Sequence, residues 1–220
     1  MDRTTKTWFD AKAVRLNCHD GLGAWMTDEQ WIRLSGAPSN SVVTVSVNSS
    51  HQVELKVENS VILAEPMIRL IIQEVGGYAF YIRNAAFVLN GNHMGKHLGA
   101  RSICMEIQQA KELGFFSKIQ THAVGNWGAF HGKEPLRGYY IWPMMGFDAR
   151  LPLSLLAHPA FPPTLRHCQT LLELLKSEAG EVFWLENGDS LLVEFDLKDG
   201  SESWIRLSHY MKQRNIEVLP

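Results

Sequence analysis

The sequence predicts an α/β protein, because clear strand patterns alternate with amphipathic helix patterns along one chain. Residues 42–47 and 53–58 have the composition of a β-hairpin, and residues 78–89 have that of a buried strand. A helix pattern follows this strand and reaches Gly114, after which residues 118–124 form another strand pattern. A long helix between two strands is expected where helices cover a sheet.

Length and charge limit the classes of function. A chain of 220 residues favours one domain with additional segments over two full domains. Its 21 basic and 23 acidic residues give a formal charge of −2, so nothing favours nucleic acid or a membrane surface as a partner. Small-molecule and protein substrates both fit this charge, and the oligomeric state is left open.

Cysteine usage indicates a reducing compartment. Cys18, Cys104 and Cys168 are far apart and odd in number, which argues against a disulfide framework or a thiolate zinc site. No apolar run reaches the roughly 18–20 residues that a spanning helix needs, and residues 1–6 lack the apolar core of a signal peptide. We therefore expect a cytoplasmic protein that does not cross a membrane.

The first third of the chain contains one predicted helix and the hairpin. Thr27 and Gln30 have the spacing of a capping box, and residues 36–38 provide the stop of a short helix. Apolar and charged residues alternate over 53–58, so the hairpin has one solvated face. Residues 67–73 fit a strand or a helical turn by periodicity alone, and we expect a helical turn or short helix there.

The central segment combines a strand, a loop and a helix. Both alternating faces of residues 78–89 are apolar or aromatic, as in a central strand covered on both sides. The loop at 90–99 contains three glycines within nine residues, so its backbone can approach a ligand closely. The helix starts near Gly95 and buries an apolar stripe, while its polar residues lie mostly on the other face: Arg101, Glu106, Gln108, Lys111 and Glu112. Free N–H groups in its first turn, the helix dipole and the cation of Lys96 predict a cradle for phosphate or pyrophosphate.

The last part of the chain is more irregular. Residues 125–133 are predicted to form a glycine-rich loop, and four prolines after Leu151 indicate an irregular connection. A helical stripe covers residues 164–177, and residues 182–184 and 190–196 have strand or extended patterns. A last helix is expected over residues 201–214.

The central loop resembles the phosphate loop of the GCN5-related N-acetyltransferases (GNAT). In that family Arg or Gln is followed by two free positions, Gly, one free position, and Gly or Ala. Residues 90–95 lie on this pattern, with Asn90 in place of Arg or Gln and His93 in place of the first Gly. The order of strand, loop, helix and strand is also similar, as is the aromatic run at 139–148 with its Gly-Phe pair.

This resemblance covers about residues 42–150 and implies a fold. It implies a single GNAT-like domain over residues 1–220, with a mixed, mostly antiparallel twisted sheet flanked by helices. The segments before residue 42 and after residue 150 would then be elaborations of that domain.

The resemblance also implies an activity and its site residues. It implies a transferase that moves an acetyl or other acyl group from acyl-CoA to an amine of a small molecule or protein. The pantetheine arm would use backbone hydrogen bonds at the end of the strand, and the expected cofactor-binding residues are Phe87, Val88, Leu89, Asn90, Gly91, Asn92, His93, Met94, Gly95, Lys96 and Asn126. Tyr140, with Tyr139 beside it, is the candidate general acid for the departing thiolate. Aromatic packing is the alternative for both tyrosines, because Trp142 stands where the family commonly has its tyrosine, and a turn is the alternative for Asn126.

Other interpretations remain open. The departures at Asn90 and His93 allow a catalytically degenerate GNAT-like protein that binds or regulates without turnover. His93 and His97 are four residues apart but lack the acidic residue of a zinc motif, so no metal site is expected. Glu54 or Glu58 could supply a base, although alternating acids on a strand face are usually only solvated. Cys104 lies on the apolar stripe and is expected to be a core residue.

Overall fold

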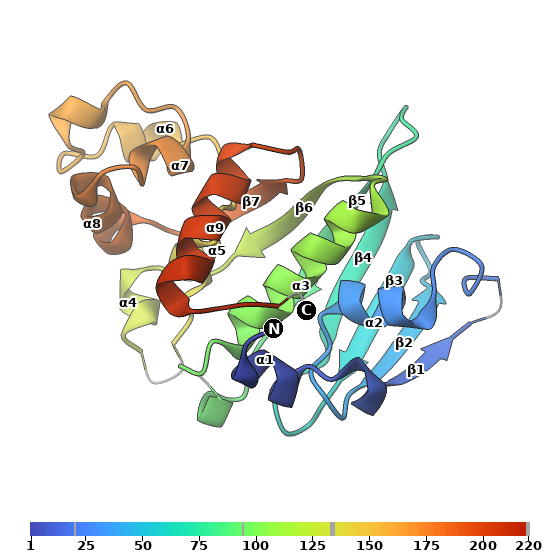
Figure 1. Cartoon of the computed structure of the whole chain (residues 1–220). Helices are drawn as coiled ribbons and strands as arrows, with labels where there is room; N and C mark the ends of the chain where they lie inside the picture. The colour runs from blue at the N-terminus through green and yellow to red at the C-terminus, as the bar shows by residue number, and fades with distance from the viewer. Residues whose placement is uncertain (20, 94, 133–134, 219–220) are drawn as a thin grey trace. The chain divides into compact units, whose positions relative to one another are not determined.

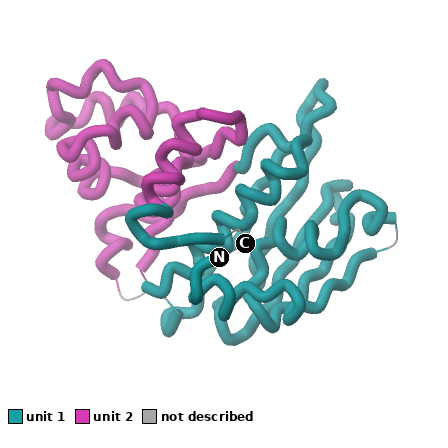
Figure 2. The backbone as a smooth tube through the Cα atoms, viewed as in Figure 1, with its two compact units in different colours: residues 1–119, 211–220 teal, residues 120–210 magenta. Residues whose placement is uncertain are grey.

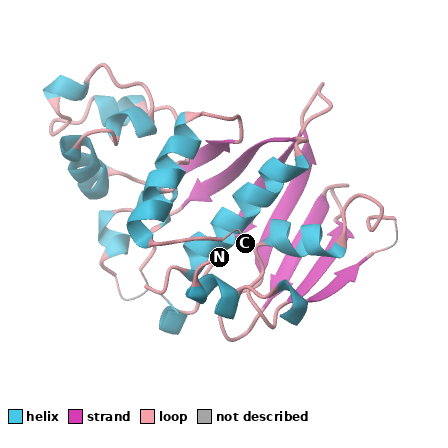
Figure 3. Cartoon of the chain, viewed as in Figure 1, coloured by secondary structure: helices cyan, strands magenta, loops and turns pink. Residues whose placement is uncertain are grey.

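The computed structural model describes residues 1–19, 21–93, 95–132 and 135–218. It shows a mixed α/β fold in which strands are hydrogen-bonded in the order β1 to β7 and helices flank them (Figure 1, Figure 3). The chain divides into two compact units, residues 1–119 with 211–220 and residues 120–210 (Figure 2). The predicted class, an α/β protein with a sheet flanked by helices, is confirmed.

Unit 1 contains the first strands and helices of the chain. Its elements are α1 (Arg3–Trp8), the 3₁₀ turn η1 (Ala11–Ala13), β1 (Arg15–Cys18), α2 (Asp28–Ser35), β2 (Val42–Val47), β3 (Val53–Glu58), β4 (Met67–Gln73), β5 (Phe80–Ala86), the 3₁₀ turn η2 (Gly91–His93) and α3 (Leu98–Leu113). Strand β6 (Phe116–Ala123) begins in unit 1 and ends in unit 2.

The sheet of unit 1 is mixed. β1 runs parallel to β2, and β2 to β5 are antiparallel neighbours with the predicted hairpin register of Val47 opposite Val53. β6 begins beside the start of β5, because Phe80 N–H donates to Phe115 O (3.1 Å) and Ser117 Oγ donates to Phe80 O (3.4 Å). Two adjacent strands that begin together and are joined by a helix form a crossover unit. The helix α3 is that connection.

Helices α2 and α3 lie side by side over the strands of unit 1 (Figure 1). The predicted capping box starts α2, since Gln30 N–H donates to Thr27 Oγ1 (3.3 Å) and Thr27 N–H donates to Gln30 Oε1 (2.8 Å). Gly36 ends the helix in the left-handed conformation. The apolar side chains beneath these helices form the core of unit 1: Leu34, Val43, Val45, Leu55, Val57, Met67, Ile71, Ile82, Ile103 and Ile107.

Several predictions for unit 1 differ from the structure. Residues 67–73 are strand β4, not a helical turn. Arg101 and Glu106 of α3 are buried rather than solvent-facing, because each meets a partner of opposite charge, Asp2 and Arg69 respectively. The strand predicted at 78–89 is regular only over Phe80–Ala86, and the helix begins at Leu98 rather than near Gly95.

Unit 2 contains short helices around β7. Its elements are α4 (Trp127–Phe130), α5 (Gly138–Met144), α6 (Leu153–Leu156), the 3₁₀ turn η3 (Pro163–Leu165), α7 (Leu171–Leu174), α8 (Glu178–Asn187) and β7 (Leu191–Asp196). Helix α9 (Glu202–Arg214) starts in unit 2 and ends in unit 1. The core of unit 2 is built mainly from aromatic and leucine side chains: Tyr139, Phe147, Phe161, Leu171, Leu174, Phe183, Trp184, Phe195 and Leu207.

The predictions for unit 2 are mixed. Strand β7 and helix α9 confirm the strand at 190–196 and the last helix at 201–214. Residues 182–184 are helical, as part of α8, which Ser177 caps by accepting the N–H of Gly180 (3.2 Å). The helix predicted at 164–177 is reduced to η3 and α7, and the loop predicted at 125–133 contains α4.

Among the described residues, no helix is long and apolar enough to cross a membrane.

Candidate functional site

The end of β5 has an irregular register. Arg69 lies opposite Asn84 and Ile68 lies opposite Ala86, so Ala85 has no residue opposite it in β4. A bulge of this kind bends and twists a strand, and bulges are common beside binding sites. The bulge therefore changes the direction of the chain just before residues 87–89.

Beyond the bulge, the backbone of residues 87–90 forms hydrogen bonds on one side only. Ala64 N–H donates to Val88 O (3.0 Å) and Asn90 N–H donates to Ile62 O (2.8 Å), around a bridge between Leu63 and Leu89. Because strand backbone groups alternate in direction, the N–H and C=O of Leu89 point to the opposite side. The backbone groups of Phe87 and Leu89 make no hydrogen bond to any other described residue. The predicted cofactor-binding segment at 87–89 thus has an open backbone edge.

The loop after β5 packs against α1. His93 N–H donates to Asn90 O (2.9 Å), and the His93 ring meets the edge of Trp8 with 5.6 Å between ring centroids. The Nδ1 atom of His93 is buried with no hydrogen-bond partner in the described part of the chain. The ammonium of Lys96 lies 5.9 Å from the ring centroid of Trp8. Met94, also predicted to bind the cofactor, lies outside the described residues.

The start of α3 has several features of an anion site. Its first turn contains no acidic residue, and its first backbone bond runs from Arg101 N–H to His97 O (3.1 Å). The N–H groups of Gly99 and Ala100 donate to no carbonyl of a described residue. Unpaired N–H groups at the positive end of a helix favour an anion.

Arg101 orients the loop that leads into α3. Its guanidinium donates to Lys96 O (3.4 Å) and His97 O (3.5 Å) through Nη1, to Thr5 Oγ1 (3.0 Å) through Nε, and to both carboxylate oxygens of Asp2 through Nη2. In a trans peptide the next N–H points opposite to the carbonyl. The N–H groups that follow Lys96 and His97 therefore point away from Arg101.

His97 occupies a backbone conformation that favours glycine. Its φ is +55°, in the left-handed region, and its side chain makes no capping hydrogen bond. Burial lowers the pKa of His97, and the positive charges of Arg214 and Arg101 lower it further. Both effects favour the neutral form of the imidazole.

The same spacing of residues also occurs four positions later in the sequence, from Met94 to Gly99. Counted from Met94, the pattern has His97 at the first glycine position and Gly99 at the second. His97 has the positive φ of a glycine, whereas His93 does not. A Cβ on Gly99 would lie 3.3 Å from Leu89 Cδ1 and 3.6 Å from Phe87 Cζ, so this glycine lets α3 approach the open edge closely.

A buried ion pair ties β4 to α3, and Asn84 of β5 joins it. Arg69 and Glu106 are both fully buried and in direct contact, and Asn84 Nδ2 donates to Glu106 Oε2 (3.0 Å). Arg69 also donates to Ser102 Oγ (3.1 Å) and Leu34 O (3.3 Å). This network lies directly beside the bulge, and it fixes the strand relative to the helix that follows it.

The remaining predicted residues belong to unit 2. Asn126 caps α4 by accepting the N–H of Ala129 (2.9 Å), which is its turn-forming role. Tyr139 is fully buried, its hydroxyl donates to Leu185 O (2.6 Å), and burial raises its pKa. Tyr140 follows it in α5 and is half-buried.

Two further candidate residues, Glu58 and Cys104, lie in different environments. Lys56 pairs with Glu58 at 2.8 Å on the solvated strand face. Cys104 is buried and its pKa is raised to about 12 by burial, as expected for a core thiol. No cluster of three or more His, Cys, Asp or Glu side chains suited to a metal occurs in the described ranges.

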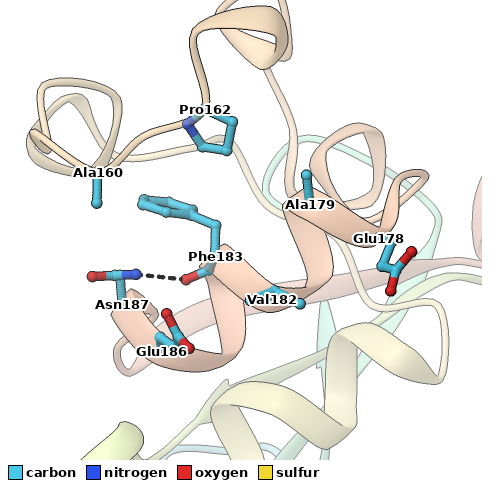
Figure 4. A pocket seen from close by; sticks show the side chains of 8 residues that line it. All are labelled: Ala160, Pro162, Glu178, Ala179, Val182, Phe183, Glu186 and Asn187. Atoms are coloured by element: carbon cyan, nitrogen blue, oxygen red, sulfur yellow. Dashed lines mark hydrogen bonds between the residues drawn. The ribbon is translucent and has the colours of Figure 1, made fainter.

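Each unit also contains a cavity. In unit 2, a shallow cavity of about 490 Å³ lies between α8 and the segment at 160–162, with Phe183 at its base (Figure 4). Asn187 Nδ2 donates to Phe183 O (3.0 Å) at one end of it. In unit 1, a cavity of about 460 Å³ is bounded by α1, η1, α2 and α3. Neither cavity contains the residues predicted for the cofactor.

Comparison with known proteins found no match: no family model, no curated protein and no solved structure is significantly similar to this chain.

Proposed function

We propose that the protein is an acyl-CoA-dependent N-acyltransferase, and that unit 1 binds the CoA moiety at the end of β5 and the start of α3. The observation that carries the proposal is the open backbone edge at Phe87 and Leu89. After it, the chain turns at His97, which has a positive φ, and enters α3, whose first turn contains no acidic residue. An extended pantetheine arm contains two amides that can pair with such an edge as an added strand would. The first turn of α3 suits its pyrophosphate.

The residues present fit an anionic ligand of this shape. Lys96 adds a cation beside the first turn, and Gly99 keeps the helix close to the strand end. Arg101 turns two carbonyls away from the position of the phosphates. The ligand supplies the activated acyl group as a thioester, and the protein supplies orientation and hydrogen-bond donors.

In the proposed reaction, the amine nitrogen of the acceptor attacks the thioester carbon, the C–S bond breaks, and an amide forms. The amine loses one proton and the departing thiolate gains one, so the protons balance within the reaction. The resemblance to GNAT assigns the proton donor to Tyr140. Tyr139 is less suited, because its hydroxyl already donates to Leu185 O.

The binding half of the proposal is tested with CoA alone. Wild-type protein should be stabilised by CoA, by roughly 2.7 kcal/mol at 100 times the dissociation constant. Lys96→Glu reverses a charge beside the phosphates and should weaken CoA binding by about tenfold or more in calorimetry. Lys198→Glu makes the same charge change on an exposed loop of unit 2 and is the matched control. Equal CoA affinities of the two variants would exclude this cradle.

Hydrogen exchange provides a direct readout of the open edge. Saturating CoA should slow exchange at the amides of Phe87 and Leu89, and leave the already paired amide of Ala64 unchanged. CoA binding without protection at 87 and 89 would move the pantetheine arm elsewhere.

The catalytic half is tested at Tyr140 once an amine acceptor is found. Tyr140→Phe should lower kcat by roughly 100-fold, within the usual range for a general acid, and leave the acyl-CoA dissociation constant within a few-fold. Tyr139→Phe is the neighbouring control, with an effect expected on stability because it loses a buried hydrogen bond. Full kcat in Tyr140→Phe would assign the proton to water or to another residue.

One observation favours a second function, a GNAT-like protein that binds or regulates without turnover. The side chain of His97 stands where the pattern has glycine, and it occupies space at the start of α3. If the imidazole only obstructs the loop, His97→Gly should tighten CoA binding. Wild-type protein that binds CoA but acylates no amine in a broad panel would support this function over the enzyme.

A further inference from the structure

Arg33 on α2 is an unusual buried cation. Its side chain is only 12% exposed, and its Nε and Nη2 atoms are buried with no hydrogen-bond partner in the described part of the chain. The Glu112 carboxylate lies 4.0 Å from Nη2, which is too far for a hydrogen bond, and half of that side chain is exposed to solvent. Buried charged groups are normally hydrogen-bonded, so this arginine lacks an acceptor.

Arg33 lines the cavity of about 460 Å³ in unit 1, which we name the Arg33 cavity. Its apolar walls come from three buried side chains, Phe9 of the α1–η1 connection, Ile32 of α2 and Met105 of α3. Pockets for small ligands are typically about 300–1,000 Å³, mostly apolar, with a few polar groups that fix orientation. The Arg33 cavity has this composition.

The charges around the cavity favour a single negative charge. Lys6 and Lys12 line it, and neither forms an ion pair with a described carboxylate. Two acids also line it: Asp10 accepts the N–H of Lys12 (3.0 Å), and Glu29 stands in the first turn of α2. Among the side chains that line the cavity, three cations and two carboxylates leave one net positive charge.

We propose that the Arg33 cavity binds an amphipathic monocarboxylate, with its carboxylate at Arg33 and its apolar body against Phe9, Ile32 and Met105. The planar guanidinium matches a carboxylate through two parallel N–H donors. Because no hydrogen bond holds its Nε and Nη2 edge, the guanidinium can turn this edge toward an entering carboxylate. None of these residues belongs to the proposed CoA cradle, so the two sites are tested independently.

The experiment uses full-length protein labelled with ¹³C at the methionine methyl groups, titrated with three probes of equal chain length: octanoate, octanol and octylamine. Octanoate should shift the Met105 methyl signal saturably, while Met144 and Met145 of unit 2 serve as internal references. Octylamine should bind at least tenfold more weakly than octanoate. Equal affinity for the two, or no shift of Met105 with octanoate, would overturn the proposal.

Two variants separate the charge from the apolar wall. Arg33→Met should weaken octanoate binding at least tenfold and leave octanol binding within about twofold. Ala11→Trp, which fills the cavity from η1 without removing a charge, should abolish the binding of both probes. Arg15→Met removes an exposed cation of β1 and should change neither. Thermal unfolding of the ligand-free Arg33→Met variant checks its fold, and unchanged octanoate affinity in the folded variant would refute the assignment.

Discussion

At the scale of single residues, two of the ion pairs of α3 lie in different environments. Arg69 and Glu106 are fully buried, and burial pushes the pKa of Glu106 up and that of Arg69 down, against their mutual attraction. Asp2 and Arg101 lie nearer the surface, where Asp2 also caps α1 and accepts the N–H of Glu217 (2.9 Å). The buried pair fixes geometry, and the outer pair makes stability depend on pH.

Asp2→Asn should reduce stability at neutral pH and not at low pH. Burial alone would raise the pKa of Asp2. Hydrogen bonds from Glu217 and Thr5 and the charge of Arg101 together lower it by more, so the net pKa lies below its ordinary value of 3.8. A depressed pKa stabilises the folded state above the unfolded-state pKa, and this contribution is lost as the pH falls toward the folded-state pKa. We expect the variant to be about 1–3 kcal/mol less stable at pH 7. Urea unfolding at pH 7, 5 and 3 should show the difference narrowing below about pH 4, and a constant difference would contradict this assignment.

At the scale of elements, the capping box of α2 is a local stability determinant. Thr27→Ala removes the acceptor for Gln30 N–H and should cost about 1 kcal/mol, while Thr27→Ser retains it. The unfolding free energy from urea titration measures both. A Thr27→Ala variant as stable as Thr27→Ser would show that solvent satisfies this helix end equally well.

The elements that sequence patterns predicted are those whose alternation or capping is local. The hairpin of β2 and β3 alternates cleanly, and α2 has both residues of its box within four positions. Strand β4 was missed because Arg69 faces the core and Ile68 and Leu70 face outward, which hides the period of two. Only the partner of Arg69, Glu106 on a helix 37 positions later, explains why a charge can face inward.

Contacts between residues that are distant in the sequence also limited the prediction of the candidate site. The strand, the loop and the helix were predicted in the correct order, and the open edge at 87–89 lies within the predicted segment. The position of the glycine-like turn was not predictable, because it depends on the φ of His97 and on the packing of Gly99 against Leu89. The Arg33 cavity could not be predicted from the sequence either, since its walls come from four elements that are separated in sequence.

At the scale of the whole molecule, the chain leaves unit 1 along β6 and returns to it at residue 211 (Figure 2). The returning segment then pairs with the start of the chain, because Asp2 N–H donates to Glu217 O (3.1 Å) and Glu217 N–H donates to Asp2 Oδ2 (2.9 Å). Ile216 and Val218 beside it are buried. Unit 1 is therefore built from both ends of the described chain.

Removing residues 215–220 should destabilise unit 1 specifically. Burying an Ile or Val side chain contributes about 1.5–3 kcal/mol, so the loss of Ile216 and Val218 should cost roughly 3–6 kcal/mol. The truncation also leaves Asp2 without the backbone N–H of Glu217, which weakens the cap of α1. Hydrogen exchange followed by mass spectrometry should show faster exchange in α1 and at the start of α3, with α8 of unit 2 unchanged.

Glu217→Ala is the matched control, because Glu217 bonds Asp2 through its backbone and the substitution should cost less than about 0.5 kcal/mol. If the truncated chain exchanges as slowly in α1 as the full chain, the returning segment does not stabilise unit 1, and the ion pair of Asp2 with Arg101 must be sufficient to hold the N-terminal helix in place.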